Sequence, residues 1–181
     1  MNLISKIVKY AQTRAKEFKK MAQTNLSIES AEANVAGQKI VFRANVEQKA
    51  AWRLYVEINT RVATQPLKAN QGLLREALNS LYKIFDVTRE ILKEAGPEVA
   101  MGKESLGFYA MAILNDILRP FLTKWHPMLL DWENQRKPSQ SMIKHEKEWT
   151  HSKTLRKELE TLRKDLIKYC NALQVLSELQ I

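Results

Sequence analysis

The amino-acid sequence predicts an all-α fold: an up-and-down bundle of four long helices with an additional amphipathic helix at the N-terminus. Three observations support this prediction. Apolar residues recur every three or four positions along most of the chain. Glycine and proline, which interrupt helices, number five each, whereas Leu, Ala, Lys and Glu are abundant. The 181 residues also suit one hydrophobic core, so we expect a single domain over residues 1–181.

Residues 1–23 are expected to form a basic amphipathic helix. Leu3, Ile4, Ile7 and Val8 begin an apolar stripe with helical spacing. Such a helix packs against a bundle or lies on anionic lipid, and the sequence leaves both open. Five lysines lie mostly off the stripe and are candidate contacts to anions or to a membrane surface: Lys6, Lys9, Lys16, Lys19 and Lys20.

Residues 24–43 lose the helical periodicity and collect Ser, Asn and Gly, so we expect a connection there. Residues 40–42 (IVF) are strand-like, but no partner strand is visible and we discount a strand. The bundle core is then expected over residues 44–181. Its first helix should begin near Ala44 and end near Gln65, because Pro66 disfavours helical geometry at the residue before it.

The next two helices of the core are expected over residues 71–94 and from about residue 97–105 onward, separated by Gly96 and Pro97. Proline removes a helical hydrogen bond and crowds the preceding turn, so the later helix should be kinked or broken near Pro120 or Pro127. Helical spacing predicts these inward-facing residues along it: Leu106, Tyr109, Ile113, Ile117 and Phe121.

A loop over residues 133–142 precedes the last helix, expected over residues 142–179. Leucines and one tyrosine along it alternate in steps of four and three, which is typical of antiparallel bundles and of coiled coils. The pattern does not say whether this seam is buried within one chain or between two copies. The seam residues are Leu155, Leu159, Leu162, Leu166, Tyr169, Leu173 and Leu176.

Polar side chains interrupt one apolar tract, residues 112–133, at Asn115, Arg119, Lys124 and His126. Charged and amide groups also interrupt a second tract, residues 52–67. The two tracts are expected to face each other across the bundle.

The segment Arg119-Pro-Phe-Leu-Thr-Lys-Trp-His126 resembles the motif of the HEPN ribonucleases, which are small all-α bundles that typically dimerise. In that family an arginine is followed four to six residues later by a histidine. The resemblance covers these eight residues and the fold class, and Pro120 stands where a polar residue is usual. It implies that His126 transfers a proton and Arg119 steadies a phosphate of RNA, without metal. The structural alternative pairs Arg119 with an acid such as Asp116 or Glu57 and bonds His126 to a kinked backbone.

No cofactor or metal is expected. His145 and His151 lie six residues apart, whereas zinc-binding histidines on one helix lie four apart. Phosphate-binding glycine loops and nucleophile elbows are missing from the sequence. Cys170 is the only cysteine and is expected to be a small packed side chain in a reducing, cytoplasmic setting.

The sequence therefore favours a non-enzymatic interaction module that binds a macromolecule through a basic and aromatic surface. The net charge of +9 permits a protein, RNA or anionic lipid as partner, and a second copy of the chain is a further candidate. The ribonuclease is one alternative. A bundle peripheral to a membrane, or one that disturbs it as part of a defence or toxin system, is the other. Candidate binding residues are Trp52, Arg53, Arg61, Arg119, Trp125, His126 and Trp132.

Overall fold

The computed structural model describes residues 1–23, 35–67, 71–102 and 104–178, and their side chains except at positions 18, 21–23 and 35–45. All regular secondary structure in this part of the chain is helical, so the all-α prediction is confirmed. The α-helices are α1 (Leu3–Gln23), α2 (Val35–Asn59), α3 (Leu74–Ala95), α4 (Leu106–Ala112), α5 (Arg119–Glu133), α6 (Met142–Glu148) and α7 (Ser152–Ser177). Short 3₁₀ turns, Val62–Thr64 and Pro97–Ala100, follow α2 and α3, and a π-helical segment, Ile113–Leu118, joins α4 to α5.

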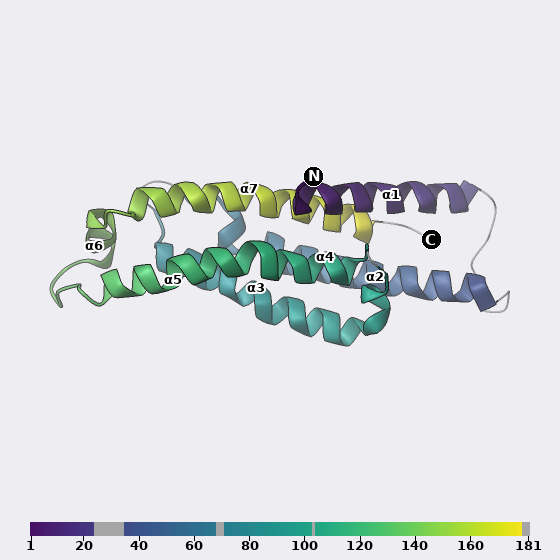
Figure 1. Cartoon of the computed structure of the whole chain (residues 1–181), viewed down its shortest axis with the longest axis horizontal. Helices are drawn as coiled ribbons and strands as arrows, with labels where there is room; N and C mark the ends of the chain where they lie inside the picture. The colour runs from purple at the N-terminus through teal and green to yellow at the C-terminus, as the bar shows by residue number, and fades with distance from the viewer. Residues whose placement is uncertain (24–34, 68–70, 103, 179–181) are drawn as a thin grey trace.

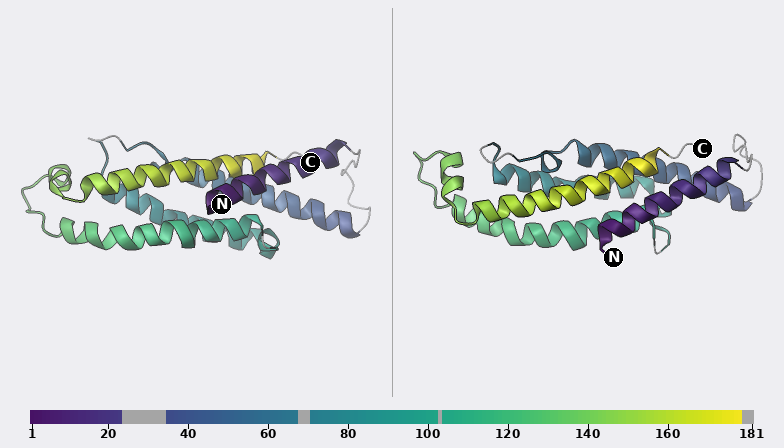
Figure 2. Two further views of the ribbon diagram at one scale, coloured as in Figure 1. Left: turned by 45° about the horizontal axis from the view of Figure 1, so that its top comes forward. Right: turned by 90° about the horizontal axis from the view of Figure 1, so that it is seen from above.

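Four long rods alternate in direction along the bundle (Figure 1). They are α2, α3, the continuous rod from α4 through the π-helical segment to α5, and α7. Helix α1 lies against the C-terminal half of α7, as both views of Figure 2 show. Both α2 and α5 pack on α3, so each of the two mixed tracts meets α3.

The heptad pattern of α7 corresponds to the side of this helix that is buried in the core. All seven seam residues are buried within this one chain, where α7 packs against α1 and α2. Tyr169 is fully enclosed, and its burial raises the pKa of its hydroxyl well above the ordinary value. Burial likewise raises the pKa of the Cys170 thiol to about 12, as expected for a packed side chain.

Helix α2 begins at Val35, nine residues before the expected start, so the connection predicted over residues 24–43 is helical from residue 35 onward. The strand-like residues 40–42 lie inside this helix. Gly37 and the small polar residues lower helix propensity by no more than about 1 kcal/mol each, a weak preference that context overrides.

The last helix is divided, which corrects the continuous helix expected over residues 142–179. Trp149 adopts an extended backbone between α6 and α7 and is buried. Its ring packs edge-on against Trp125, with ring centres 6.0 Å apart. Burial of a tryptophan outweighs the continuity of one helix, and α6 consequently crosses the end of the bundle (Figure 1).

Pro120 does not break the helix, which instead widens into a π turn just before the proline. The N–H of Arg119 donates to the carbonyl of Leu114, five residues back, within a widened π turn. This turn makes room for the proline ring, and Pro127 lies inside α5 without ending it. The inward face moves by one residue: Leu118 and Leu122 are buried, whereas the predicted Ile117 and Phe121 are only partly so.

Glu146 of α6 joins three helices. Its Oε2 accepts a hydrogen bond of 2.7 Å from the backbone N–H of Leu74, the first residue of α3. Its Oε1 accepts from the guanidinium of Arg156 on α7, which also donates to the carbonyl of Gly72. Leu73 offers no side-chain cap, so the carboxylate of Glu146 serves as a remote cap and complements the helix dipole.

We expect Glu146→Ala to lower the free energy of unfolding by about 2–4 kcal/mol, because it removes a buried charge-assisted contact and leaves Arg156 without this partner. Glu146→Gln should lower the free energy of unfolding by less, since its amide oxygen can still accept a hydrogen bond from the N–H of Leu74. Urea denaturation measures both. The exposed control Asp131→Asn should change stability little, and equal effects of all three substitutions would contradict the role given to Glu146.

Candidate functional site

Arg119 and His126 are held by different partners. Exposed Arg119 donates from Nε and Nη2 to Oδ1 of Asn115, at 3.3 and 3.0 Å, and its guanidinium lies 5.4 Å from the ring centre of Phe85. The expected pairing with Asp116 or Glu57 is therefore replaced by an amide and an aromatic ring, and Glu57 pairs with Arg61 at 2.8 Å instead.

The guanidinium beside His126 belongs to Arg75 of α3. Its Nη1 donates to Nδ1 of His126 at 2.7 Å, and the same arginine pairs with Glu133 at 2.8 Å. The groups that face the His126 ring are thus those of α3, the guanidinium of Arg75 and the backbone of Leu78, in place of the kinked backbone of its own helix. Arg119 and His126 are seven residues apart on α5, about 10 Å along the axis. No feature of the sequence points to Arg75 as the neighbour of His126.

The pKa of His126 is lowered, first by burial and then by the positive charge of Arg75, while the backbone of Leu78 and the carboxylate of Glu133 act in the opposite direction. Arginine only donates, so Nδ1 of His126 must accept, and the ring proton of the neutral imidazole is on Nε2. His126 therefore links α3 and α5 in its neutral form.

Two of the tryptophans expected at the binding surface are structural. Trp125 is 1% exposed, and its Nε1 donates to Oε2 of Glu158 at 2.8 Å. Trp132 is stacked on His145 with ring centres 4.5 Å apart, and its Nε1 donates to the carbonyl of His145. These residues join α5 to α6 and α7, so the seven predicted binding residues do not form one surface.

Helix α1 has one buried and one exposed face, as its amphipathic pattern predicts. Ile4, Ile7 and Ala11 are buried in the core. The five candidate lysines, Lys6, Lys9, Lys16, Lys19 and Lys20, are exposed. Tyr10 and Arg14 both bind the buried carboxylate of Glu47 on α2. The N-terminal half of the stripe is thus occupied by the bundle.

The residues that the structure describes contain neither a candidate membrane span nor a candidate metal cluster. None of their helices combines the length and apolarity that a bilayer span needs. Nor do their His, Cys, Asp and Glu side chains gather in groups of three or more that could hold a metal ion.

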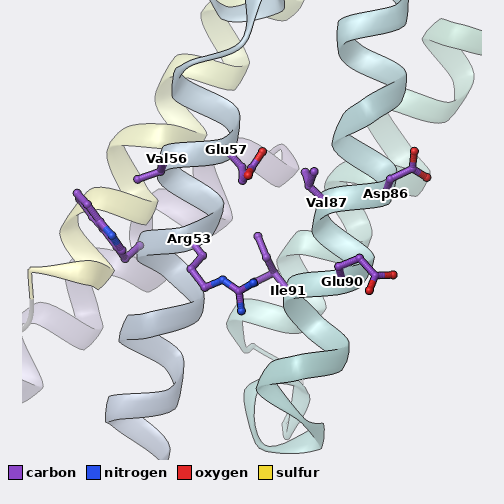
Figure 3. A pocket seen from close by; sticks show the side chains of 8 residues that line it. Arg53, Val56, Glu57, Asp86, Val87, Glu90 and Ile91 are labelled. Carbon is purple, nitrogen blue, oxygen red and sulfur yellow. The ribbon is translucent and has the colours of Figure 1, made fainter.

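A groove between α2 and α3 brings together exposed apolar, aromatic and acidic side chains. It consists of two adjoining hollows of about 330 and 490 Å³ that share Trp52, Arg53 and Ile91. Figure 3 shows Val87 and Ile91 of α3 pointing toward α2, and Arg53 reaching from α2 toward α3. Trp52 is 55% exposed, the most exposed tryptophan of the chain's four.

The α3 side of this groove carries an acid at every fourth residue: Asp86, Glu90 and Glu94, followed by Glu98 in the next 3₁₀ turn. Residues four apart lie on one face of a helix, so these carboxylates form a row, which we call the acidic rim. In Figure 3 Asp86 and Glu90 stand on the outward side of α3. The sequence analysis missed this rim, although the spacing of acids by four was a visible signal.

Arg53 crosses the groove and forms an ion pair with Glu94, which holds the pKa of that carboxyl below its usual range. Across both hollows five carboxylates, including Glu57, face two cations, Lys49 and Arg53. Beside the groove, Arg61 pairs with Glu57, Lys83 and Arg89 pair with Asp86, and Lys93 pairs with Glu90. The carboxylates of the groove are therefore matched by cations of the same chain.

Known protein families, curated proteins and solved structures offer no match to this chain.

The contact between His126 and Arg75 predicts a pH dependence of stability. The unfolded chain takes up a proton on this imidazole at a higher pH than the folded chain does, so protonation favours unfolding. The stabilisation is intact above the ordinary histidine pKa of roughly 6.5 and is lost as the pH falls from there through the lowered pKa of the folded state.

Urea unfolding at a series of pH values between neutral and about 5 tests this. His126→Gln keeps an acceptor for Arg75 but cannot titrate, so its stability should fall less with acid than that of the wild type. A wild-type slope in His126→Gln would refute the assignment.

Proposed function

We propose that the chain is a non-enzymatic helical interaction module that binds a protein partner in the groove between α2 and α3. The exposed ring of Trp52 carries this proposal. Removing apolar surface from water contributes roughly 25 cal/mol per Å², and tryptophan is enriched among residues that dominate binding energy. Its neighbour Tyr55, 5.8 Å away between ring centres, supports the ring from the same helix.

The apolar floor supports a partner that inserts side chains. Val56 is 38% exposed, and Val87 and Ile91 line the same hollow. Aliphatic side chains beside a tryptophan form the kind of site that accepts the apolar face of another protein. The rim then supplies polar contacts at the edge.

The ribonuclease hypothesis for Arg119 and His126 stays a prediction, as does binding of α1 to anionic lipid. Neither gains a specific observation from the geometry, since Arg119 and His126 have separate partners and the buried residues of α1 pack on the bundle.

Photo-crosslinking in the native host tests the proposal. A benzophenone amino acid at Val56 should form a stoichiometric adduct with one protein, because this position lies next to Trp52. The same amino acid at Leu130, an apolar position on α5 that is 51% exposed, is the control and should not form that adduct.

Trp52→Ala should abolish the adduct and lower the affinity for the identified partner by about 2 kcal/mol, while stability changes little because the side chain is more than half exposed. Calorimetry with the purified partner measures the affinity. The same adduct at Val56 and Leu130, or an affinity unchanged by Trp52→Ala, would exclude the groove as the binding site.

A further inference from the structure

We propose that a hollow at the α6 end of the bundle binds a small amphipathic carboxylate of the medium-chain fatty-acid class. The hollow lies between α5, α6 and the start of α3, where α6 crosses the bundle (Figure 1). Its volume is about 420 Å³, and sites for small molecules span roughly 300–1,000 Å³. It shares no lining residue with the α2–α3 groove, so this site is separate from the one proposed for a protein partner.

One part of the lining is apolar. Leu129 is buried and forms the floor, whereas Leu130 and Met142 are about half exposed at the entrance. Leu73 and Trp132 complete this part of the lining. A short hydrocarbon chain that covers these side chains is removed from water together with them, which is the main favourable term in the binding of apolar groups.

Most of the charged groups of the lining are already bound within the chain. Arg75 donates from Nε and Nη2 to the carboxylate of Glu133, at 3.0 and 2.8 Å. Glu146 accepts from the guanidinium of Arg156 and from the first backbone N–H of α3. A ligand therefore meets these carboxylates as parts of neutralised pairs.

The imidazole of His145 is engaged as well. It is stacked on Trp132, and its Nε2 lies 2.7 Å from the carbonyl oxygen of the same residue. A carbonyl oxygen only accepts, so Nε2 of His145 carries a proton and donates it to this bond. That proton is not available to a ligand.

Arg136 differs from the other charged residues of the lining. It is half-buried, and it donates from Nη1 to the carbonyl of Gln140 at 2.6 Å, which is a neutral acceptor. Within the described part of the chain, no carboxylate lies within ion-pair distance of its guanidinium, in contrast to Arg75 and Arg156. A guanidinium stays charged at neutral pH, and its parallel N–H groups match the two oxygens of a carboxylate.

This arrangement selects the head group of the ligand. A cationic head is repelled by Arg136, and a neutral head gains no charge-assisted hydrogen bond. A phosphate monoester carries close to two negative charges near neutral pH, which one arginine does not balance while Glu133 lies in the same lining. A carboxylate brings one charge and two acceptor oxygens, and so matches Arg136 best.

Calorimetry with the full chain and octanoate tests the proposal. Octan-1-ol and octyltrimethylammonium have the same chain with a neutral or a cationic head. Octanoate should bind about tenfold more tightly than either, because it alone can form charge-assisted hydrogen bonds with Arg136. Equal binding of the three compounds, or no binding of octanoate at about 1 mM, would overturn the inference.

Nuclear magnetic resonance of the ¹⁵N-labelled chain locates the bound octanoate. The indole N–H of Trp132 donates to the carbonyl of His145 in the wall of the hollow, so its signal should shift as octanoate is added. The indole signal of Trp52, in the α2–α3 groove, should stay in place. A shift of Trp52 without one of Trp132 would put the ligand in the groove and contradict the site named here.

Substitutions at Arg136 separate the head group from the chain. Arg136→Gln should weaken octanoate by about tenfold and leave octanol unchanged, and Arg136→Lys should recover part of the loss because it keeps the charge. Lys137→Gln removes an equal charge from an exposed neighbour and should have no effect. Equal losses in Arg136→Gln and Lys137→Gln, or loss of octanol as well in Arg136→Gln, would overturn the role of Arg136.

A substitution at the entrance tests the apolar part of the site. Leu130→Ser should weaken octanoate and octanol alike, by about threefold, because it removes an apolar contact that both chains use. The side chain of Leu130 is about half exposed, so the fold should tolerate this change. Unchanged binding of both compounds to Leu130→Ser would exclude this hollow as the site of the hydrocarbon chain.

Discussion

A single buried carboxylate, that of Glu146, anchors α3, the helix that the groove and the His126 contact share. Glu146 bonds the first backbone N–H of α3 and the guanidinium of Arg156, so that α3, α6 and α7 share one anchor. Because a helix is stiff, fixing the first turn of α3 also fixes where Arg75, Tyr82 and the acidic rim lie farther along it. The site thus depends on a contact formed at the other end of the same helix.

Periodicity predicted the fold class and the seam of α7 because buried leucines repeat with the helix. It did not predict contacts between helices that depend on three-dimensional neighbours. The Arg75–His126 bond joins residues 51 positions apart, and the Glu146–Leu74 bond joins residues 72 apart. Trp125 and Trp132 were assigned to a surface because tryptophan is common at interfaces, yet tryptophan is also a core residue when its N–H finds an acceptor, as both do here.

The net charge of the chain did not predict which charged side chains line the candidate site. A total of +9 suggested acidic partners, but a total says nothing about distribution. Many of the basic side chains lie along α1 and α7, whereas the acids of α3 line its groove. The acids at the candidate site are paired with cations of the same chain, an arrangement that a total charge cannot reveal.

The π turn before Pro120 has a consequence for how the length of this chain can change. One row of buried residues in the α4–α5 rod follows steps of four, five, four, three and four through Tyr109, Ile113, Leu118, Leu122, Trp125 and Leu129, with Ala110 and Leu114 buried beside it. The step of five lies across the π segment, which is equivalent to an α-helix with one residue inserted. A related chain with one residue fewer between positions 113 and 118 would keep the core positions on the two sides of the π segment in phase. Loss of one residue elsewhere in the rod would rotate its remaining core face by about 100°.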